Sequence, residues 1–463
     1  MRESRRYIAL AGIGPHAKNN HLPLFAEDAT IQLAAVVELR SREDDARAAV
    51  AGHPGYTRFI WCPDEASYNE QLPLEVSSSL DRLVDANRLD GLVVATHPRA
   101  HAAYLRWAAS RGVDVLVDKP VTAHQLVDDQ SARDLELVYD DLRSLFEASS
   151  ASAAVMTSRR AHRGYSFVKE YATTFGTEHG VPLTSIESSF AHGYWNMPDE
   201  FFMRENHSYR DGYGVLLHAG YHAIDTVCWL LDANDALGYN AAYDEMRVST
   251  RHVNAADFFC QVNEQAYELA FGPTDVGRWM TPDAIAAAAG FGATDVWLLF
   301  QRRRSGRTIT TGAIHVGESA VCMRASRQLP ADTYRGNGRV TRDRITLQFG
   351  HLLAIEARSR RGFGTSADAE DGVFSVDIMR NSSLLGGNAV EQHVFTARDT
   401  GSLCADGRRE IFRRWIARLE TGSELGSHSD AIKLLSAAER SIIRDRSGLP
   451  AEVQVHVDTV TNG

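Results

Sequence analysis

Lysine is scarce in this chain. Of the 49 lysine and arginine residues among 463, only four are lysines: Lys18, Lys119, Lys169 and Lys433. Because arginine carries most of the positive charge, a lysine kept at the carboxyl end of an apolar strand suggests a need for a compact ammonium that can titrate. Lys119 stands at such a position, after residues 113–117. It is therefore the first candidate functional residue, with an ordinary solvated loop lysine as the alternative.

Other features are also missing. The net charge of -11 excludes nucleic-acid binding through a broad basic surface. The five cysteines form no CxxC pair, which favours reduced thiols in the cytoplasm over a disulfide framework or a zinc site. The Arg5-Arg6 pair resembles a twin-arginine export signal, but the apolar run after it is short. No apolar run approaches the roughly 20 residues of a membrane span, so we expect no membrane partner.

The length of 463 residues favours two or three domains over one core. A run of small residues at 148–154 is the predicted boundary. We therefore expect one domain at 1–150 and a second at 151–463.

A glycine turn follows the first apolar segment. Residues 7–11 are typical of a short buried strand, and a helix is expected to begin near Asn19. Strand, glycine turn and helix match the dinucleotide fingerprint, in which the helix amino terminus faces the phosphates. The predicted cofactor-binding residues of this turn are Gly12, Ile13, Gly14, Pro15, His16 and Ala17.

Glu38 follows the second predicted strand, at 33–37, at the distance expected for a carboxylate that holds the ribose hydroxyls. Its negative charge favours NAD. Arg40 and Arg42 are close enough in sequence to accommodate a 2′-phosphate, so NADP stays the alternative.

Two further strands are expected at 91–95 and 113–117, with a helix at 102–111 between them and a polar, irregular insertion with helical pieces at 61–87 before them. The alternation of strand and helix predicts a parallel sheet. The carboxyl ends of such strands hold the ligand. The residues expected there, near the nicotinamide, are Thr96, His97, Pro98, His101, Asp118 and Lys119.

The predicted second domain begins with Arg160 and an aromatic, histidine-rich segment at 192–210. We expect Arg160, Tyr194 and Trp195 to bind substrate; a lid or a subunit contact is the alternative for the aromatic segment. Alternating patterns then predict a large, mostly antiparallel sheet with one face free for another subunit. The expected strands are 183–190, 295–301, 308–315, 320–325, 344–349, 352–358 and 373–379, and helices are expected at 125–149, 164–175, 410–419 and 429–444.

His218, His222 and Asp225 have the spacing of residues that share one face of a helix. The two histidines are four residues apart, which also suits zinc. No glutamate lies between them and no third ligand is evident, so we predict no metal.

Three motifs, in order, resemble the Gfo/Idh/MocA oxidoreductase family, which includes glucose-fructose oxidoreductase and inositol dehydrogenase. They are the glycine turn followed by His21, then Asp118-Lys119-Pro120 preceded by Thr96, Pro98 and His101, and then His218 to His222 followed by Ile224-Asp225. Three departures are that Asp118 stands for a glutamate, that His218 stands for a carboxylate, and that the chain is longer than is typical.

The resemblance implies an α/β fold, with a Rossmann domain followed by an α/β domain that carries an open sheet. It implies a homodimer or homotetramer, and hydride transfer between NAD(P) and a hydroxyl-bearing carbon of a sugar, cyclitol or sugar-acid derivative. Lys119 and His222 fall on the family's catalytic positions. Such a reaction needs a base for the hydroxyl proton and a cation for the developing oxyanion. His222 is the expected base and Lys119 the expected cation.

His218 is the open point of this assignment. An imidazole can donate a hydrogen bond where a carboxylate would accept one, so the substrate would carry a carboxylate or carbonyl there; the alternative is a core histidine. Two other functions stay open as well. The family includes NAD-dependent glycosidases, which show no net change in NADH, and non-catalytic regulators that sense the nucleotide.

Overall fold

A computed structural model describes eight ranges of the chain and divides it into two compact units. The first unit comprises residues 1–124, 134–161 and 404–429, and the second comprises 125–133, 162–403 and 430–463. The first unit thus includes a late segment, 404–429, which the division into 1–150 and 151–463 assigns to the other domain. The described residues are 5–53, 57–205, 207–240, 242–272, 275–322, 339–361, 372–396 and 405–457.

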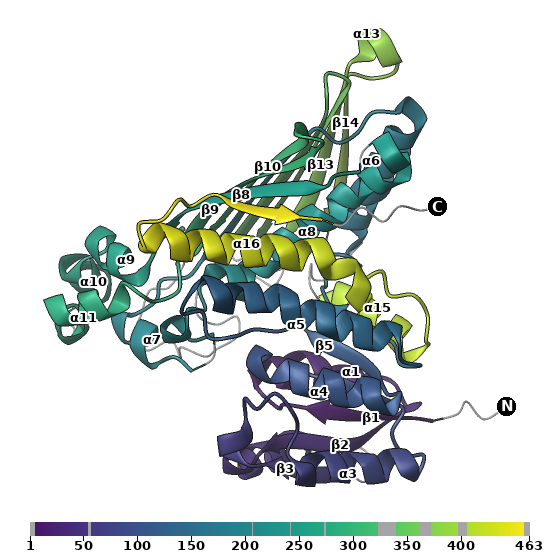
Figure 1. Cartoon of the computed structure of the whole chain (residues 1–463), viewed down its shortest axis with the longest axis vertical. Coiled ribbons are helices and arrows are strands. Elements are labelled where there is room, and N and C mark those ends of the chain that lie inside the picture. Colours follow the sequence, from purple (N-terminus) through teal and green to yellow (C-terminus); the bar gives the residue numbers. More distant parts are fainter. Residues whose placement is uncertain are drawn as a thin grey trace. The chain divides into compact units, whose positions relative to one another are not determined.

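The first unit is built on a six-stranded sheet in the order β3-β2-β1-β4-β5-β6, and every pair of neighbours is parallel. This arrangement confirms the predicted Rossmann sheet. Its interior strands are almost fully buried, as expected for a parallel sheet covered on both faces. The strands are β1 Arg6–Ala11, β2 Ile31–Leu39, β3 Arg58–Cys62, β4 Gly91–Val94, β5 Asp114–Asp118 and β6 Ala153–Met156 (Figure 1).

The insertion predicted at 61–87 contains one of the expected helical pieces, the 12-residue helix α3, Leu74–Asp85, but was wrong at its start, which is the end of β3. The late helix α15, Ala405–Ile416, was expected as a closing helix at 410–419. It places Ile411, Phe412 and Trp415 in the core of the first unit. The other helices here are η1 Ala17–His21, α1 Leu22–Glu27, η2 Arg40–Arg42, α2 Glu43–Val50, η3 Asp64–Ala66, α4 Pro98–Arg111 and η8 Leu425–His428. Helix α5, Asp129–Glu147, belongs to this unit from residue 134 onward, and its start belongs to the second unit.

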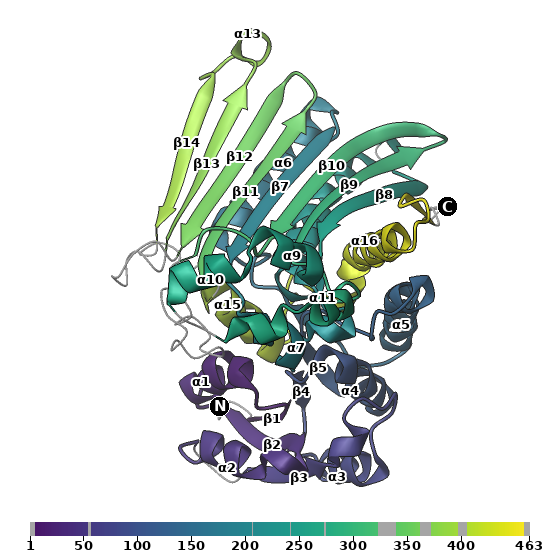
Figure 2. The same cartoon turned by 90° about the vertical axis from the view of Figure 1, so that its left-hand side faces the viewer.

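The second unit contains a nine-stranded sheet in the order β14-β13-β12-β11-β7-β10-β9-β8-β15. Only β7 and β10 pair in parallel within it, which confirms the predicted mostly antiparallel sheet. Figure 2 shows it as a long, curved fan. The strands are β7 Ser185–Gly193, β8 Glu245–Val253, β9 Asp295–Arg304, β10 Arg307–Gly317, β11 Val340–Phe349, β12 Leu353–Arg361, β13 Val373–Arg380, β14 Val390–Thr396 and β15 Val453–His456.

Three of these strands, β8, β14 and β15, were not predicted. The strand predicted at 320–325 was wrong for its described part, since residues 320–322 lie outside any strand, while 323–325 lie outside the described residues. One face of the sheet packs against α6, Arg163–His179, and α8, Tyr221–Leu231, because alternate residues along each strand are apolar. The opposite face leaves Trp297 and Leu299 more than half exposed.

A helical insertion between β8 and β9 forms a second core in this unit. The insertion packs aromatic side chains such as Phe258 and Tyr267 around Phe201 of α7, Pro198–Met203. Figure 2 shows α7, α9, α10 and α11 gathered at one end of the sheet. The insertion consists of α9 Ala255–Gln261, α10 Glu264–Phe271, η7 Val276–Trp279 and α11 Pro282–Ala288.

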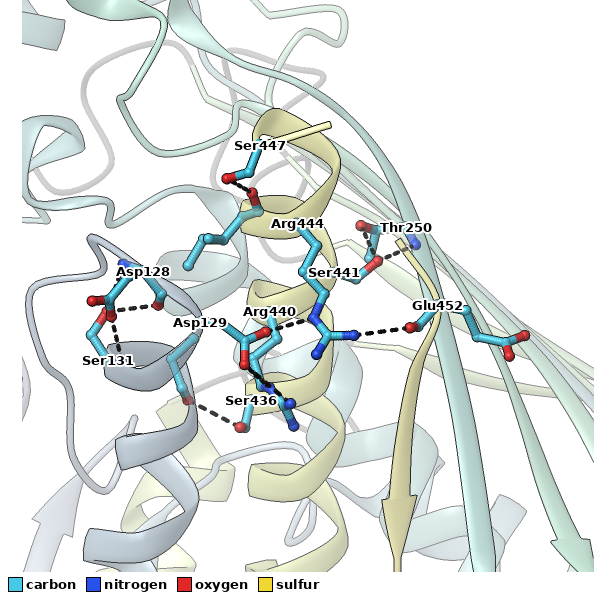
Figure 3. A network of polar contacts seen from close by, with 12 residues as sticks. Asp128, Asp129, Ser131, Thr250, Ser436, Arg440, Ser441, Arg444, Ser447 and Glu452 are labelled. Atoms are coloured by element: carbon cyan, nitrogen blue, oxygen red, sulfur yellow. Dashed lines mark hydrogen bonds and ion pairs between the residues drawn. The ribbon is translucent and has the colours of Figure 1, made fainter. Parts of the chain in front are cut away.

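Helix α16, Ser429–Arg446, is tied to its surroundings by polar contacts (Figure 3). Arg440 and Arg444 both donate to Asp129 at the start of α5, at 3.2 and 2.7 Å. Ser441 Oγ accepts from the Thr250 amide of β8 at 2.9 Å. These contacts fix the last long helix beside the edge of the sheet. None of the helices in the described ranges is long and apolar enough to span a bilayer.

Candidate active site

The glycine turn after β1 has the geometry of a dinucleotide cradle. Gly12 takes a φ of +87°, and a Cβ there would lie 2.7 Å from the carbonyl oxygen of Ala95, so only glycine fits. A Cβ on Gly14 would meet no heavy atom within 4 Å. The backbone at Gly14 is therefore open to a close ligand, which fits the pyrophosphate of a dinucleotide. Ile13 and Ala17 are buried beside it.

Glu38 belongs to this cradle. It lies near the end of β2, and its Oε2 accepts from the Ile13 N–H at 2.6 Å while its Oε1 accepts from the Leu39 N–H at 2.7 Å. The residue is 8% exposed. A fixed carboxylate thus lies against the glycine turn, where a ribose is held in such folds. Arg40 follows on the exposed turn η2.

The helix after the glycine turn opens with a π-helical turn, η1, and two histidines lie close to Asp118: His16 just before this turn and His21 at its end. His21 Nε2 lies 2.9 Å from Asp118 Oδ1, and His16 Nε2 lies 3.5 Å from Asp118 Oδ2. Burial lowers the pKa of His16 to about 4. Burial alone would raise the pKa of Asp118, but the two imidazoles together lower it. The result is an ionised carboxylate clamped between imidazole rings.

His16, His21 and Asp118 could also hold a metal ion, since their ligand atoms lie within 4.8 Å of one another. Histidines that bind metals almost always donate their second ring N–H to an acceptor. Here the side-chain amide nitrogen of Asn20, a donor, faces His16 Nδ1 at 3.2 Å. No acceptor among the described residues reaches His21 Nδ1, which is buried. The arrangement fits hydrogen bonds from Nε2–H to Asp118 better than a metal centre.

The turn after β4 is locked to the strand that carries Lys119. His97 caps α4, because its Nδ1 accepts from the Arg99 N–H at 3.3 Å, and Pro98 is the first helical residue. His101 is fully buried, with its two ring nitrogens 3.0 Å from the Pro120 carbonyl oxygen and 3.1 Å from that of Thr96. Lys119 then follows β5, half-buried, at the carboxyl end of the sheet.

Arg160 differs from the expectation of a substrate-binding residue. It is 5% exposed, and its guanidinium donates to Ser427 Oγ at 2.7 Å and lies 3.3 Å from His428 Nδ1. These bonds fasten the late segment 404–429 within the first unit. Arg160 therefore helps to hold this segment, and its expected contact with substrate stays a prediction.

In the second unit, Tyr194 and Trp195 follow β7. The Tyr194 hydroxyl donates to Glu200 at 2.6 Å, and the Arg204 and Arg339 guanidinium groups lie 5.8 and 5.3 Å from the centre of its ring. The Trp195 ring packs on aromatic rings of α10 in the helical insertion. Both side chains are thus held by contacts with neighbouring protein side chains.

His218 and His222 do not share one regular helix. His218 lies in a second π-helical turn, η5 Leu216–Gly220, and His222 lies in the first turn of α8. π-Helical turns are rare and are frequent at functional sites. Two imidazoles stand on His218: His207 stacks at 4.2 Å between ring centres, and His192 meets it edge-on at 5.5 Å.

Glu318 is the residue that sequence reasoning missed. It directly follows β10, is 2% exposed, and its Oε1 lies 3.2 Å from His218 Nδ1. Oε2 accepts from the Tyr209 hydroxyl and, at 3.4 Å, from the side-chain amide of Asn196. No local motif links it to a histidine 100 residues earlier, and only the pairing of β10 beside β7 signals the contact.

Comparison with known families gives one match. The family model described as an oxidoreductase family with an NAD-binding Rossmann fold, Gfo/Idh/MocA, matches residues 6–136. This range contains the glycine turn, Glu38, the Thr96 turn and Asp118-Lys119-Pro120. A search of curated proteins found no match.

Solved structures resemble the whole chain in fold. An oxidoreductase from Agrobacterium radiobacter, in complex with NAD+, L-tartaric acid and magnesium, has a TM-score of 0.56 at 13% identity over 98% of both chains. An aldose-aldose oxidoreductase from Caulobacter crescentus, complexed with glycerol, has a TM-score of 0.54 at 13% identity, covering 98% of this chain and 100% of that one. A 3-ketoreductase from Actinomadura kijaniata, with NADP and TDP-benzene, has a TM-score of 0.53 at 14% identity, over 96% and 98%. Residues 6–136 are thus similar to the Gfo/Idh/MocA oxidoreductase family with its NAD-binding Rossmann fold, and the solved structures share the fold of the whole chain.

Proposed function

We propose that this protein transfers a hydride between NAD(P) and a hydroxyl-bearing carbon of a sugar, a cyclitol or a sugar-acid derivative. The observation that carries the proposal is the glycine cradle, with Glu38 bonded to it. The lysine at the end of β5 adds to it, since it supplies a cation at the edge of the sheet where such folds hold their ligands.

The nicotinamide supplies the hydride chemistry when the cofactor is bound. The chain's own residues hold the cofactor: the backbone of Gly12 to Ala17 receives the pyrophosphate and Glu38 receives the ribose. The fixed negative charge of Glu38 supports NAD over NADP, because it repels a 2′-phosphate.

The reaction also needs a positive charge to stabilise the oxyanion and a group to accept the hydroxyl proton. The Lys119 ammonium stabilises the oxyanion that develops on the substrate, and an imidazole of the His218 and His222 pair takes the hydroxyl proton. Histidine suits this role because its ordinary pKa lies near neutrality.

The substrate class is supported by what related folds bind. Tartaric acid, glycerol and aldoses are all polyhydroxyl compounds, and the first also carries carboxylates. The second unit offers Arg204, Arg339 and several imidazoles near one another around Tyr194 and His218. The two guanidinium groups favour a substrate with an acidic group.

The test is absorbance at the reduced-nicotinamide wavelength, with NAD or NADP and a panel of sugars, cyclitols and sugar acids. We expect a rise with one substrate class, faster with NAD. Release of a glycone without net NADH would instead identify a glycosidase. Tight cofactor binding with no turnover across the panel would favour a nucleotide sensor and would overturn the proposal.

We also propose a homodimer or homotetramer. The uncovered face of the nine-stranded sheet carries Trp297, Leu299 and, at the other edge, Val394, each more than half exposed. Strand register puts Trp297 and Val394 on the same side. Light scattering on the eluting protein tests this: Trp297→Asp is expected to lower the mass, and a monomeric wild-type protein contradicts it.

A further inference from the structure

The His218 and Glu318 pair reaches the surface at its imidazole end. The Glu318 carboxyl is 2% exposed, whereas the His218 side chain is 15% exposed, and the two are joined through His218 Nδ1 at 3.2 Å. A carboxylate that accepts from Nδ1 fixes the imidazole in the tautomer whose Nε2 is unprotonated. The arrangement is therefore that of an oriented proton acceptor.

The surroundings of Glu318 keep it an acceptor. Burial raises the pKa of Glu318, and the Tyr209 hydroxyl bond and the charges of Arg204 and Arg339 oppose that rise. The side-chain amide of Asn196 adds another donor. Burial outweighs these effects, so the pKa of Glu318 is raised overall, while both other donors bond Oε2 and leave Oε1 to accept from His218.

The His218 ring is also held from its sides. His207 stacks on it at an interplanar angle of 29°, and does so from a backbone with φ of +55°, a left-handed conformation that non-glycine residues adopt at a cost. His192 of β7 meets the ring at 86°. The titratable and charged groups that face His218 or its carboxylate partner are His192, His207, Tyr209, Arg204, Arg339 and Glu318.

We propose that Glu318 is the positioning residue of His218, and that His218 Nε2 is the atom that accepts the substrate's hydroxyl proton. The inference rests on the proposed function. As the hydroxyl O–H bond breaks, its proton moves to Nε2, and the two electrons of the C–H bond leave as hydride to NAD(P)+, the oxidant. Glu318 stays a carboxylate and stabilises the imidazolium. At position 218 the family carries a carboxylate. In this chain the carboxylate comes from Glu318, 100 positions later, and it acts through the His218 imidazole.

The first test reads the tautomer without turnover. Long-range proton–nitrogen NMR spectra of the whole protein with 15N-labelled histidine are compared with those of His218→Asn, which identifies the His218 signals. We expect the Nδ1–H form in the free protein at neutral pH. The Nε2–H form would overturn the inference and leave the proposed function untouched.

The second test removes the charge and keeps the shape. In Glu318→Gln, we expect kcat to fall about tenfold or more and the acid limb of its pH profile to move down by about one pH unit, because the imidazolium loses its counter-charge. KM for NAD should not change. Glu439→Gln, which alters another buried carboxyl in the same unit, is the matched control and should leave the acid limb in place. An unmoved limb in Glu318→Gln contradicts the proposal.

A third variant pair covers the case in which Glu318→Gln does not fold. His218→Asp sets two carboxyl groups against each other, and adding Glu318→Gln relieves that repulsion. We expect the double variant to be at least several-fold more active than His218→Asp alone. Equal or lower activity in the folded double variant would contradict the pairing.

Discussion

Two five-residue π-helical turns, η1 and η5, each open a helix and each carry a histidine bonded to a distant acid. His21 on η1 meets Asp118, 97 residues away, and His218 on η5 meets Glu318, 100 residues away. The two pairs nevertheless differ in setting. Asp118 has an imidazole on each oxygen and a lowered pKa, while Glu318 is shared with a phenol and an amide and has a raised pKa.

This difference suggests different roles for the two pairs. The first holds the Asp118 carboxylate between imidazole rings, and the second is the proposed site of proton transfer. Just before η1, burial lowers the pKa of His16 to about 4, so this imidazole stays neutral across neutral pH. On η5, burial raises the pKa of Glu318, and the Tyr209 hydroxyl bond and the nearby guanidinium charges oppose that rise. The same local device thus fixes the cofactor turn in one unit and is suited to proton transfer in the other.

The largest expected effect comes from Lys119, the residue that follows Asp118. Lys119→Ala removes the cation but leaves His16, His21 and Asp118 in place, so NAD binding should stay nearly intact while kcat falls about 100-fold or more. Stopped-flow turnover and NAD titration measure the two quantities separately. Lys18→Ala, at a lysine paired with Asp45, is the control and should keep full turnover. Retained turnover in Lys119→Ala would sink the assignment.

The second effect tests whether the first unit determines the choice between NAD and NADP. Glu38→Gln removes the charge beside the glycine turn, so the ratio of NADP to NAD affinity should rise about tenfold. Calorimetric titration with each cofactor measures it, and Glu43→Gln on the exposed start of α2 is the control. An unchanged ratio would show that Glu38 does not face the ribose.

The third effect is on stability and follows from the lowered pKa of His16. Between pH 6.5 and about 4 the unfolded chain binds a proton that the folded chain rejects, so stability falls as the pH drops through this window. His16→Gln should make the fall smaller by about 1 kcal/mol, after allowance for a ring that is a third exposed. Urea midpoints at pH 7 and pH 5 provide the measurement. An identical pH dependence in both proteins would mean that burial does not hold His16 neutral.

The smallest effect belongs to a carboxylate outside either pair. Asp129, with a side chain 38% exposed, bonds Arg440 and Arg444 of α16. Asp129→Asn should therefore cost only about 0.5–1 kcal/mol, as followed by thermal unfolding. A loss above about 3 kcal/mol would show that exposed pairs matter here as much as buried ones.

Local sequence patterns predicted the first unit well where functional residues lie at fixed spacings along the chain. The glycine turn, Glu38 and the strand before Lys119 lie where expected, because each depends on neighbours within a few residues. The strand β3 was missed, since its few residues are followed by a polar stretch. The return of residues 404–429 to this unit was also missed, because its hydrogen bonds join Arg160 to Ser427, 267 positions later.

The second unit shows what spacing cannot predict. The i, i+4 pattern found His218 and His222 but implied one regular helix, whereas His218 lies in a π-helical turn and His222 in the α-helix that follows it. The partner of His218 depends on the register that sets the end of β10 beside the end of β7, where the Tyr194 N–H bonds the Glu318 carbonyl at 3.1 Å. Long-range strand pairing of this kind leaves no signal in the spacing of residues.

The most direct measurement of the central claim follows the transferred hydrogen. A substrate found by the absorbance panel is deuterated at its hydroxyl-bearing carbon and incubated with the protein and NAD. We predict one deuterium at C4 of the nicotinamide for each carbonyl product formed. Deuterium that stays on the substrate carbon, with no reduced nicotinamide formed, would contradict the account.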